Sequence, residues 1–406
     1  MSHNHEEQHL DALAINSFRK YLQISSVHPH VDYKGCVDFL QEQAKSLNLP
    51  IDVIYVEPDK PVIIITWTGQ KPKLPSILLN SHMDVVPVYE DKWTYKPFEA
   101  TVENGKIYAR GTQDMKSVGI QYLEAIRRLK LAGVSFVRTI HICFVPDEEI
   151  SGFIEVGMTL FVKTKKFKEL NVGFSLDEGI ASPSNHFTLF YGERCSIMIN
   201  ITCHGQTGHG SNLLPNTAGQ KLSNILKKFS EFRKKQQNLL KENPSLTLGD
   251  VTSVNVTKLS GGIKMNVLPA ELKVVIDCRL AVTEDLEEWK KTVIGWCQEA
   301  GKDVDVEFKH VLPQVPVTKL DNSNPYWAPF SEAINELGIE IKPQIFSAGT
   351  DSQLLRQEGI PAIGFSPINN TPVLLHDHDE YLGIDTFLKG IDIYCGIIKK
   401  IANLEA

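Results

Sequence analysis

Three largely apolar runs, each followed by acidic residues or histidine, constrain this chain more than any other feature of its sequence. The runs span Ser76–Asn80, Thr139–Val145 and Val172–Leu176. A short run that is apolar at nearly every position is typical of a strand buried on both faces, as in parallel sheets covered by helices. A helix-like segment at 115–131 separates the first run from the second. This alternation predicts an α/β fold with polar side chains where the strands end.

The same α/β character covers both ends of the chain. The spacing of apolar residues predicts helices near 10–23, 36–47 and 386–401, and strand-like runs occur at 52–57, 62–67, 341–346 and 362–365. We therefore predict a domain with a mixed, mostly parallel sheet covered by helices, formed by residues 1–193 and 311–406.

The pattern changes between residues 194 and 310. Strand-like segments at 196–202, 253–259, 272–279 and 304–309 alternate with helical segments at 217–241 and 286–300. This β-α-β-β-α-β order is that of a ferredoxin-like α+β fold, in which an antiparallel sheet packs against two helices. The sequence therefore predicts a second domain at 194–310, inserted into the first.

Composition excludes several classes of protein. The 406 residues carry a formal net charge of −7, which argues against nucleic acid as the main partner because phosphate binding requires a concentrated basic face. No run approaches the roughly 18 consecutive apolar residues of a membrane span, and the first residues include no apolar segment typical of secretion. The seven cysteines are scattered without a C-x-x-C pair, as is typical of reduced, buried thiols. We expect a cytoplasmic protein that binds a small molecule, with no nucleic-acid or membrane partner.

The first polar patch places a carboxylate two residues after a histidine. Because strand side chains repeat with period two, His82 could bind a metal ion while Asp84 holds its second ring nitrogen. Asp114 lies in a glycine-containing loop just before the helix at 115–131, and its two oxygens could bridge two cations. Each patch also has a simpler interpretation: a surface histidine beside a helix-capping Asp84, and an Asp114 stabilised by a helix N-terminus.

Adjacent acids follow the second and third apolar runs. Asp147, Glu148 and Glu149 would repel one another beside a buried strand unless protons or cations compensate, although an acidic surface loop is the alternative. Of two adjacent glutamates, one can bind metal while the other takes a proton from water. At Asp177-Glu178, one acid should face the site and the other support it, because neighbouring strand residues point to opposite faces.

The last patch is the sequence His-Asp-His-Asp-Glu at 376–380. Together with the earlier acids and His82, it supplies oxygen and nitrogen donors that suit Zn²⁺, with Co²⁺ or Mn²⁺ as substitutes. The chain has no P-loop or G-x-S-x-G motif. The pattern therefore predicts one binuclear metal site built from distant parts of the sequence.

In combination, these motifs resemble those of the M20 family of metallopeptidases. The similarity covers essentially the whole chain and rests on Leu78–His82, Gln113–Lys116, Phe144–Glu149 and Leu374–Glu380. The resemblance implies five metal ligands. His82 and Glu178 would bind one zinc ion, Glu149 and His376 would bind the other, and Asp114 would bridge both. It also implies that Glu148 is the general base and Asp84 the support of His82, with His378 outside the ligand set.

The resemblance assigns further roles within residues 194–310, which are similar to the family's lid and dimerisation domain. His209 matches a lid histidine that reaches the partner subunit's active site and stabilises the oxyanion. Asn266 and Arg279 match positions that bind the substrate carboxylate, a task suited to a bidentate guanidinium. Without the resemblance, Asn266 would be interpreted as a turn residue and Arg279 as a strand-end ion pair.

The activity implied is hydrolysis of N-acyl-L-amino acids to a carboxylate and a free L-amino acid, by a homodimeric amidohydrolase with two zinc ions per subunit. Another activity of the same family, that of a dipeptidase or carboxypeptidase, would use the same chemistry with a different pocket. A non-catalytic binding protein is a third possibility, but the complete ligand set and Glu148 argue against it.

Overall fold

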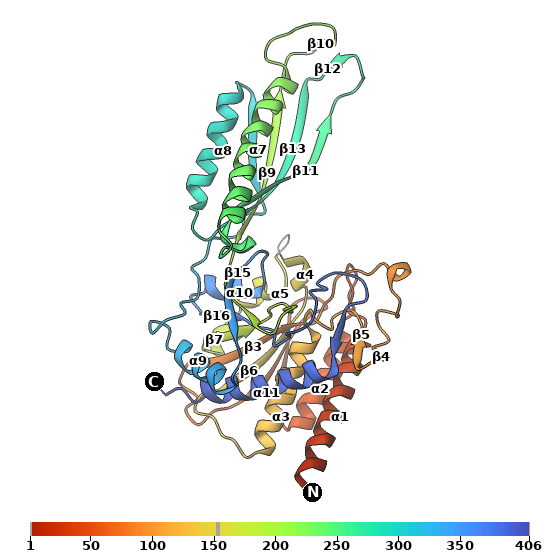
Figure 1. Ribbon diagram of the computed structural model, residues 1–406, viewed down its shortest axis with the longest axis vertical. Coiled ribbons are helices and arrows are strands. Elements are labelled where there is room, and N and C mark those ends of the chain that lie inside the picture. The colour runs from red at the N-terminus through yellow and green to blue at the C-terminus, as the bar shows by residue number, and fades with distance from the viewer. Residues whose placement is uncertain (1, 152–154, 406) are drawn as a thin grey trace. The chain divides into compact units, whose positions relative to one another are not determined.

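The computed structural model describes residues 2–151 and 155–405, which form two compact units (Figure 1). The larger unit contains the residues up to Tyr191, Thr318–Pro343 and the residues from Thr350 onward. The smaller unit contains Gly192–Val317 and Gln344–Gly349.

An eight-stranded sheet forms the centre of the larger unit, in the order β1-β2-β6-β3-β7-β16-β8-β15. The strands are β1 (Ile51–Glu57), β2 (Lys60–Trp67), β3 (Ser76–His82), β6 (Ile140–Val145), β7 (Val172–Asp177), β8 (Phe187–Glu193), β15 (Ile341–Phe346) and β16 (Ala362–Gly364). Strands β6, β3, β7 and β16 are mutually parallel, whereas β1 pairs antiparallel with β2, β2 with β6, and β8 with β16. The predicted mixed α/β sheet is confirmed, with parallel pairs among its four central strands.

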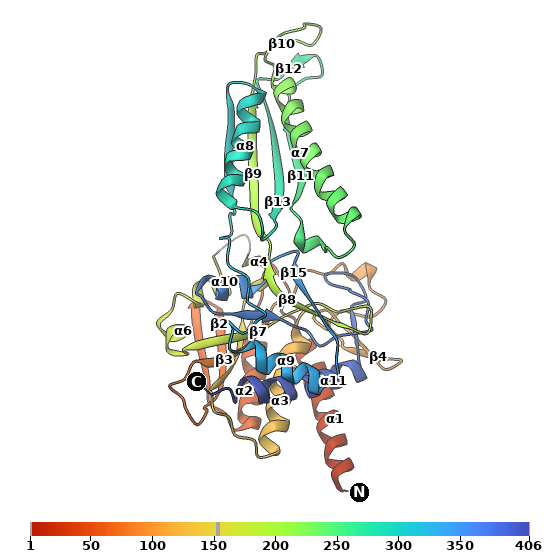
Figure 2. The same ribbon diagram turned by 60° about the vertical axis from the view of Figure 1, so that its left-hand side comes forward.

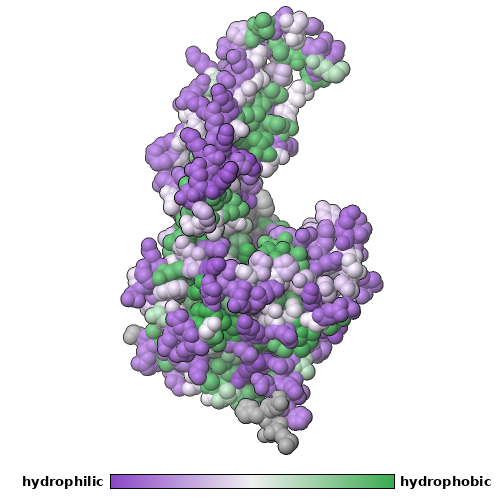
Figure 3. Space-filling model, viewed as in Figure 1, coloured by the Kyte–Doolittle hydropathy of each residue, from purple (hydrophilic) through white to green (hydrophobic). Residues whose placement is uncertain are grey.

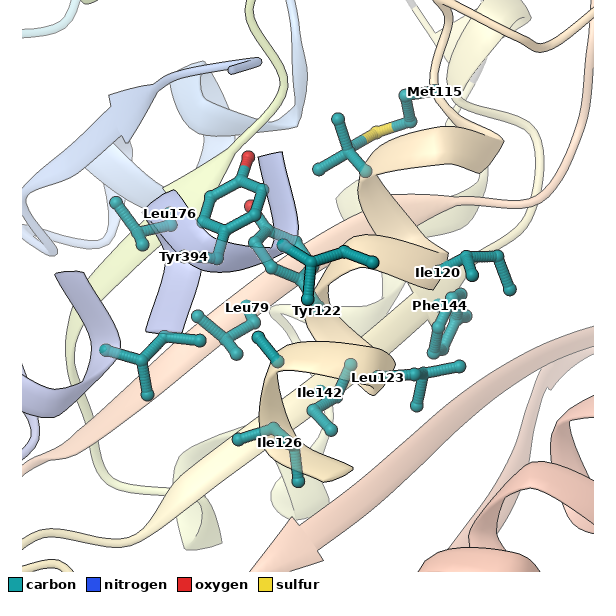
Figure 4. Packing of buried hydrophobic residues seen from close by; sticks show 14 of the residues in the cluster. Leu79, Met115, Ile120, Tyr122, Leu123, Ile126, Ile142, Phe144, Leu176 and Tyr394 are labelled. Atoms are coloured by element: carbon teal, nitrogen blue, oxygen red, sulfur yellow. The ribbon is translucent and has the colours of Figure 1, made fainter. Parts of the chain in front are cut away.

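Successive residues of the central strands enter two cores, one on each face of the sheet. Leu79 of β3 and Ile142 of β6 belong to the first core, whereas Leu78 and Cys143 belong to the second. Figure 4 shows Tyr122 of α3 (Lys116–Leu131) packed with Leu79 and Ile142 in the first core. Because both faces are covered, these strands are apolar at nearly every position.

Different helices supply the two cores. The first contains residues of α1 (Ser2–Leu22), α2 (Lys34–Leu47), α3, α9 (Trp327–Glu336) and α11 (Ile384–Ile401). The second contains residues of α5 (Gly157–Phe161), α6 (Lys165–Glu169) and α10 (Asp351–Gln357). Among the described residues, no helix is both long enough and apolar enough to cross a bilayer.

The smaller unit contains a four-stranded antiparallel sheet in the order β11-β13-β9-β14. Its strands are β9 (Cys195–His204), β11 (Ser253–Gly261), β13 (Glu271–Leu280) and β14 (Val304–Lys309). Helices α7 (Ala218–Glu242) and α8 (Leu286–Ala300) lie along one face, as Figure 2 shows. Buried residues alternate with less buried ones along β13, as expected for a sheet covered on one side. This is the predicted β-α-β-β-α-β order.

Several short elements were missed by the sequence patterns. They are the two-stranded sheet of β10 (Gly208–His209) and β12 (Val267–Leu268), the three-stranded sheet of β4 (Thr101–Glu103), β5 (Lys106–Tyr108) and β17 (Tyr381–Gly383), strand β8, and helices α4 (Glu148–Ser151), α5, α6, α9 and α10. Most of these are too short for a periodic signal. Helix α1 also begins at Ser2 rather than near residue 10.

Candidate metal centre

The predicted ligands of the larger unit meet at the carboxyl ends of three neighbouring strands. His82 is the last residue of β3, and its register partner on β6 is Val145. Glu148 and Glu149 begin α4 shortly after β6, and Glu178 directly follows β7. Since β3 lies between β6 and β7 and all three are parallel, their carboxyl ends lie at the same edge of the sheet.

Two loops bring the remaining two ligands to this edge. Asp114 lies between β5 and α3, and His376 lies between β16 and β17. One oxygen of Asp114, Oδ1, is 3.0 Å from His82 Nε2, while the other, Oδ2, is 3.2 Å from His376 Nε2. A carboxylate with one oxygen towards each of two histidines has the geometry of a bridging ligand.

The two histidines mark two groups of donor atoms. His82 Nε2 is 3.5 Å from Glu178 Oε2, and His376 Nε2 is 3.1 Å from Glu149 Oε2. Ligand atoms of His82, Asp114 and Glu149 lie within 4.8 Å of one another, and so do those of His82, Glu148 and Glu178. The structure thus gathers the predicted ligands of the larger unit, which lie up to 294 positions apart in sequence.

The hydrogen bonds within the centre polarise its histidines and its bridging carboxylate. Burial raises the pKa of Asp114, but hydrogen bonds with His376 and His82 outweigh it and leave the pKa well below its usual value. Hydrogen bonds to Asp114 and Glu149 raise the pKa of His376 to about 10. In the protein alone, the imidazoles therefore provide the positive charge that faces Asp114.

Glu148, Glu149 and Glu178 lie close together with too little positive charge nearby to stabilise all three as carboxylates. Burial and repulsion from Glu178 raise the pKa of Glu148, and burial and repulsion from Asp114 raise the pKa values of Glu149 and Glu178. Divalent cations placed among these groups would favour the ionised carboxylates and the neutral imidazoles. The oxygen and nitrogen donor set and its surplus of acid therefore fit a pair of bound metal ions.

The structure separates the roles of the adjacent acids Asp177 and Glu178. The buried Asp177 carboxylate accepts hydrogen bonds from Asn80 Nδ2 at 3.1 Å and from Ser352 Oγ at 2.8 Å. Glu178 instead faces His82. This geometry favours Glu178 over Asp177 as the ligand, a choice that the sequence pattern left open.

Asp84 differs from the sequence expectation. The ring nitrogen Nδ1 of His82 lies 2.9 Å from the backbone oxygen of Asp84 and 3.7 Å from its carboxylate. The carboxylate instead accepts hydrogen bonds from the backbone N–H groups of Glu148 and Glu149, each at 3.1 Å. Strand β3 ends at His82, so the period-two rule does not extend to Asp84.

Two further residues, which the sequence patterns did not single out, connect the loops of Asp114 and His376. The buried Glu380 carboxylate accepts hydrogen bonds from Arg110 Nη1 at 2.7 Å and from the backbone N–H of Gln113 at 2.6 Å. The Gln113 side chain in turn bonds to the backbone of residues 372, 374 and 381. Glu380 belongs to the acid-rich patch at 376–380, which was the only sequence signal for it. Each loop thus holds the backbone of the other, which sets the separation of the two ligands.

The three remaining predicted site residues lie in the smaller unit. His209 and Asn266 are exposed at the two-stranded sheet of β10 and β12, with His209 Nε2 3.4 Å from Asn266 Nδ2. Arg279, near the end of β13, forms two hydrogen bonds with Asp277, at 2.9 and 3.2 Å. Along β13 the register runs from Glu271, opposite His204, to Arg279, opposite Ser196. The β10–β12 pair follows the His204 end of β9 and precedes the Glu271 end of β13, so it and Arg279 lie at opposite ends of the four-stranded sheet.

Comparisons with known proteins show the family to which this chain belongs. Residues 78–400 match the model of peptidase family M20/M25/M40. The chain is 48% identical to aminoacylase-1 of Mus musculus over 96% of each chain, and 46% identical to aminoacylase-1 of Homo sapiens over 99% of this chain and 97% of that protein. Aminoacylase-1 of Dictyostelium discoideum is 43% identical over 96% of this chain and 98% of its own length.

Solved structures show the same fold at low sequence identity. An M20 family metallo-carboxypeptidase from Sulfolobus solfataricus superposes with a TM-score of 0.73 at 18% identity, covering 96% of this chain and 99% of its own. A dinuclear metal binding peptidase of the M20 family from Bacillus subtilis gives a TM-score of 0.69 at 17% identity, covering 98% of this chain and 100% of its own.

Proposed function

Since this chain belongs to peptidase family M20/M25/M40, we propose that it is a metal-dependent amidohydrolase that cleaves N-acyl-L-amino acids into a carboxylate and a free L-amino acid. The substrate class is that of the aminoacylase-1 relatives, which match over nearly the full length. The observation that carries the proposal is the position of Asp114, with one oxygen near each histidine. Glu148 lies in a second cluster, which shares His82 with that of Asp114.

The proposed cofactor is a pair of zinc ions, for which Co²⁺ or Mn²⁺ could substitute. His82 and Glu178 would hold one ion, Glu149 and His376 the other, and Asp114 both. When bound, two such ions polarise the amide carbonyl and lower the pKa of the attacking water. The mixture of carboxylates and imidazoles is one that zinc accepts.

Glu148 is the proposed general base. Its carboxylate atoms cluster with those of His82 and Glu178, while its backbone N–H is fixed by Asp84. It would accept a proton as the water oxygen bonds to the carbonyl carbon, and deliver that proton to the amide nitrogen as the C–N bond breaks.

The smaller unit is proposed as the lid and dimerisation domain. Arg279 is separated from the β10–β12 pair, with Asn266 and His209, by at least eight residues of β13, or about 27 Å at ~3.4 Å per residue. One smaller unit therefore cannot bring Arg279 and Asn266 to the same substrate carboxylate. A site that uses both requires two copies, which supports the proposed homodimer, with His209 and Asn266 reaching the partner's site.

Two further properties support the proposal. Figure 3 shows hydrophobic residues on the surface of the smaller unit. Val256 and Leu259 of the edge strand β11 are 45% and 58% exposed. A second copy could cover such a surface. The seven cysteines are free thiols, and six of them are buried, which supports a reducing cytoplasmic location.

A pair of assays tests the substrate class. Hydrolysis of N-acetyl-L-methionine is compared with hydrolysis of an unblocked dipeptide that carries the same methionine at its carboxyl end. The proposal expects turnover of the acetylated substrate and little turnover of the dipeptide, in zinc-loaded protein. The reverse preference would replace it with a dipeptidase, and the absence of turnover with either substrate in metal-loaded protein would indicate a binding protein.

A further inference from the structure

A buried histidine outside the predicted ligand set contacts the carboxylate of Asp84. His28 follows α1 and is 6% exposed, and its Nε2 lies 2.8 Å from Asp84 Oδ2. Backbone hydrogen bonds hold this contact in place: the His28 N–H donates to the Val85 carbonyl at 3.2 Å, and the Val85 N–H donates to the Ser26 carbonyl at 2.9 Å. The segment carrying His28 is thus paired with the chain just after β3.

Asp84 uses its carboxylate to arrange the start of α4. Oδ1 accepts the N–H of Glu148, and Oδ2 accepts both the N–H of Glu149 and the hydrogen bond of His28. Asp84 is completely buried, so its orientation depends on these three donors. The two backbone donors move with α4 itself. Among the described residues, His28 is therefore the one side chain that forms a hydrogen bond with the Asp84 carboxylate and does not belong to α4, the segment that Asp84 positions.

His28 has no competing role at the neighbouring carboxylate. Its Nε2 is 3.9 Å from Asp147 Oδ1, which is too long for a hydrogen bond. Asp147 is already bonded to Tyr33 Oη at 2.7 Å and paired with Lys60 Nζ at 2.7 Å. The second ring nitrogen of His28, Nδ1, has no hydrogen-bond partner among the described residues. The contact with Asp84 is therefore the polar interaction that the His28 ring makes.

We propose that His28 is a positioning residue that orients Asp84 and, through it, the general base Glu148 and the metal ligand Glu149. The proposal rests on the proposed function, because it takes the roles of the two glutamates from it. A donor at the position of Nε2 keeps the Asp84 carboxylate turned towards the two N–H groups. Without that donor, Asp84 can rotate, and α4 no longer presents both glutamates to the centre.

Two amide replacements separate the position of the donor from the bulk of the ring. In His28→Gln, the side-chain amide nitrogen lies the same number of bonds from the backbone as Nε2, so it can reach Asp84. In His28→Asn, the amide nitrogen corresponds to Nδ1 and falls short. His28→Ala removes the donor altogether. His141→Gln serves as the matched control, because His141 is also 6% exposed but bonds to Thr66 Oγ1 on the sheet.

Each variant is measured in two ways on the full-length protein. Steady-state kinetics with N-acetyl-L-methionine give kcat and KM, and titration of metal-free protein with Co²⁺, followed by visible absorption, gives metal affinity without substrate. For His28→Asn and His28→Ala, we expect kcat and Co²⁺ affinity to fall by about tenfold to hundredfold, as for other groups that orient metal ligands, with KM little changed. His28→Gln and His141→Gln should stay within about threefold of the wild type.

The outcomes distinguish this proposal from the proposed function. Unchanged kcat and Co²⁺ affinity in His28→Asn, or equal losses in the Gln and Asn variants, would overturn the positioning role. If the wild type hydrolyses no N-acyl amino acid, the proposed function fails, but the Co²⁺ titration still decides whether His28 orients the ligands. If His28→Ala does not fold, the comparison of His28→Gln with His28→Asn remains decisive.

Discussion

Replacing Gln113 with methionine should weaken the attachment between the loops of Asp114 and His376. The Gln113 side chain is buried and makes three hydrogen bonds: it donates to the carbonyls of Pro372 at 3.2 Å and Tyr381 at 2.9 Å, and accepts from the N–H of Leu374 at 3.0 Å. Methionine has nearly the same shape but makes none of them. At about 1 kcal/mol for each bond, the free energy of unfolding should fall by about 3 kcal/mol.

Gln121 offers an internal scale for this estimate. It is fully buried, and its side chain makes one hydrogen bond, to the carbonyl of Phe387 at 3.0 Å. Gln121→Met should therefore cost about 1 kcal/mol. Gln70→Met, at an exposed glutamine bonded to Ser135, should cost less than about 0.5 kcal/mol. The three substitutions have the same chemistry and differ in burial and in the number of bonds.

Urea unfolding measures the global effect, and hydrogen exchange at the Leu374 amide measures the local one. In Gln113→Met, the Leu374 N–H loses its acceptor, so its protection should fall by at least the factor corresponding to one hydrogen bond, about fivefold. The same amide should exchange at the wild-type rate in Gln121→Met. Equal stability losses in Gln113→Met and Gln121→Met, with Leu374 still protected, would refute the idea that Gln113 anchors this loop.

Three other predictions concern the centre itself. Glu148→Gln should lower kcat by about 10²- to 10⁴-fold while elemental analysis finds the metal content unchanged, and near-normal turnover would remove Glu148 from the role of base. Asp114→Asn replaces one of the two carboxylate oxygens, each of which faces a different histidine, with an amide nitrogen. Metal analysis should then find about one ion bound per chain instead of two. Two tightly bound ions would rule out the bridging role of Asp114. In metal-free protein, the folded-state pKa of His376, raised to about 10, lies above its unfolded value, so its contribution to stability should be complete below about pH 6.5 and be lost as pH rises towards 10. Denaturation at several pH values, with His376→Asn as the reference, checks this, and parallel pH profiles for both proteins would contradict it.

Much of the fold was accessible from local patterns. The runs at 76–80 and 139–145 were identified as buried strands because side chains on both of their faces lie in apolar cores. The alternation in 196–202 marked a strand with one covered face, and β9 indeed alternates over most of its length. The two-stranded sheet of β10 and β12 was missed because its two-residue strands carry no periodic signal.

The site was predictable to a lesser degree. Proximity of His82, Glu149 and Glu178 follows from parallel strands that end at one edge of a sheet, a rule that applies before any coordinates are known. The contact between His82 and Asp84 was predicted through the carboxylate, but the backbone carbonyl makes it, since the chain leaves β3 at His82. A pattern of period two cannot report where a strand stops.

The order of residues along the chain was enough to place acids and imidazoles at strand ends, because a strand buried on both faces must be apolar until it emerges. Which donor meets which acceptor depended on packing between distant segments. Glu380 bonds to the Arg110 side chain across 270 positions, and His28 reaches Asp84 across 56. Such contacts leave no local periodicity, since a hydrogen bond is directional and short, and its partner is set by how whole layers of the fold come together.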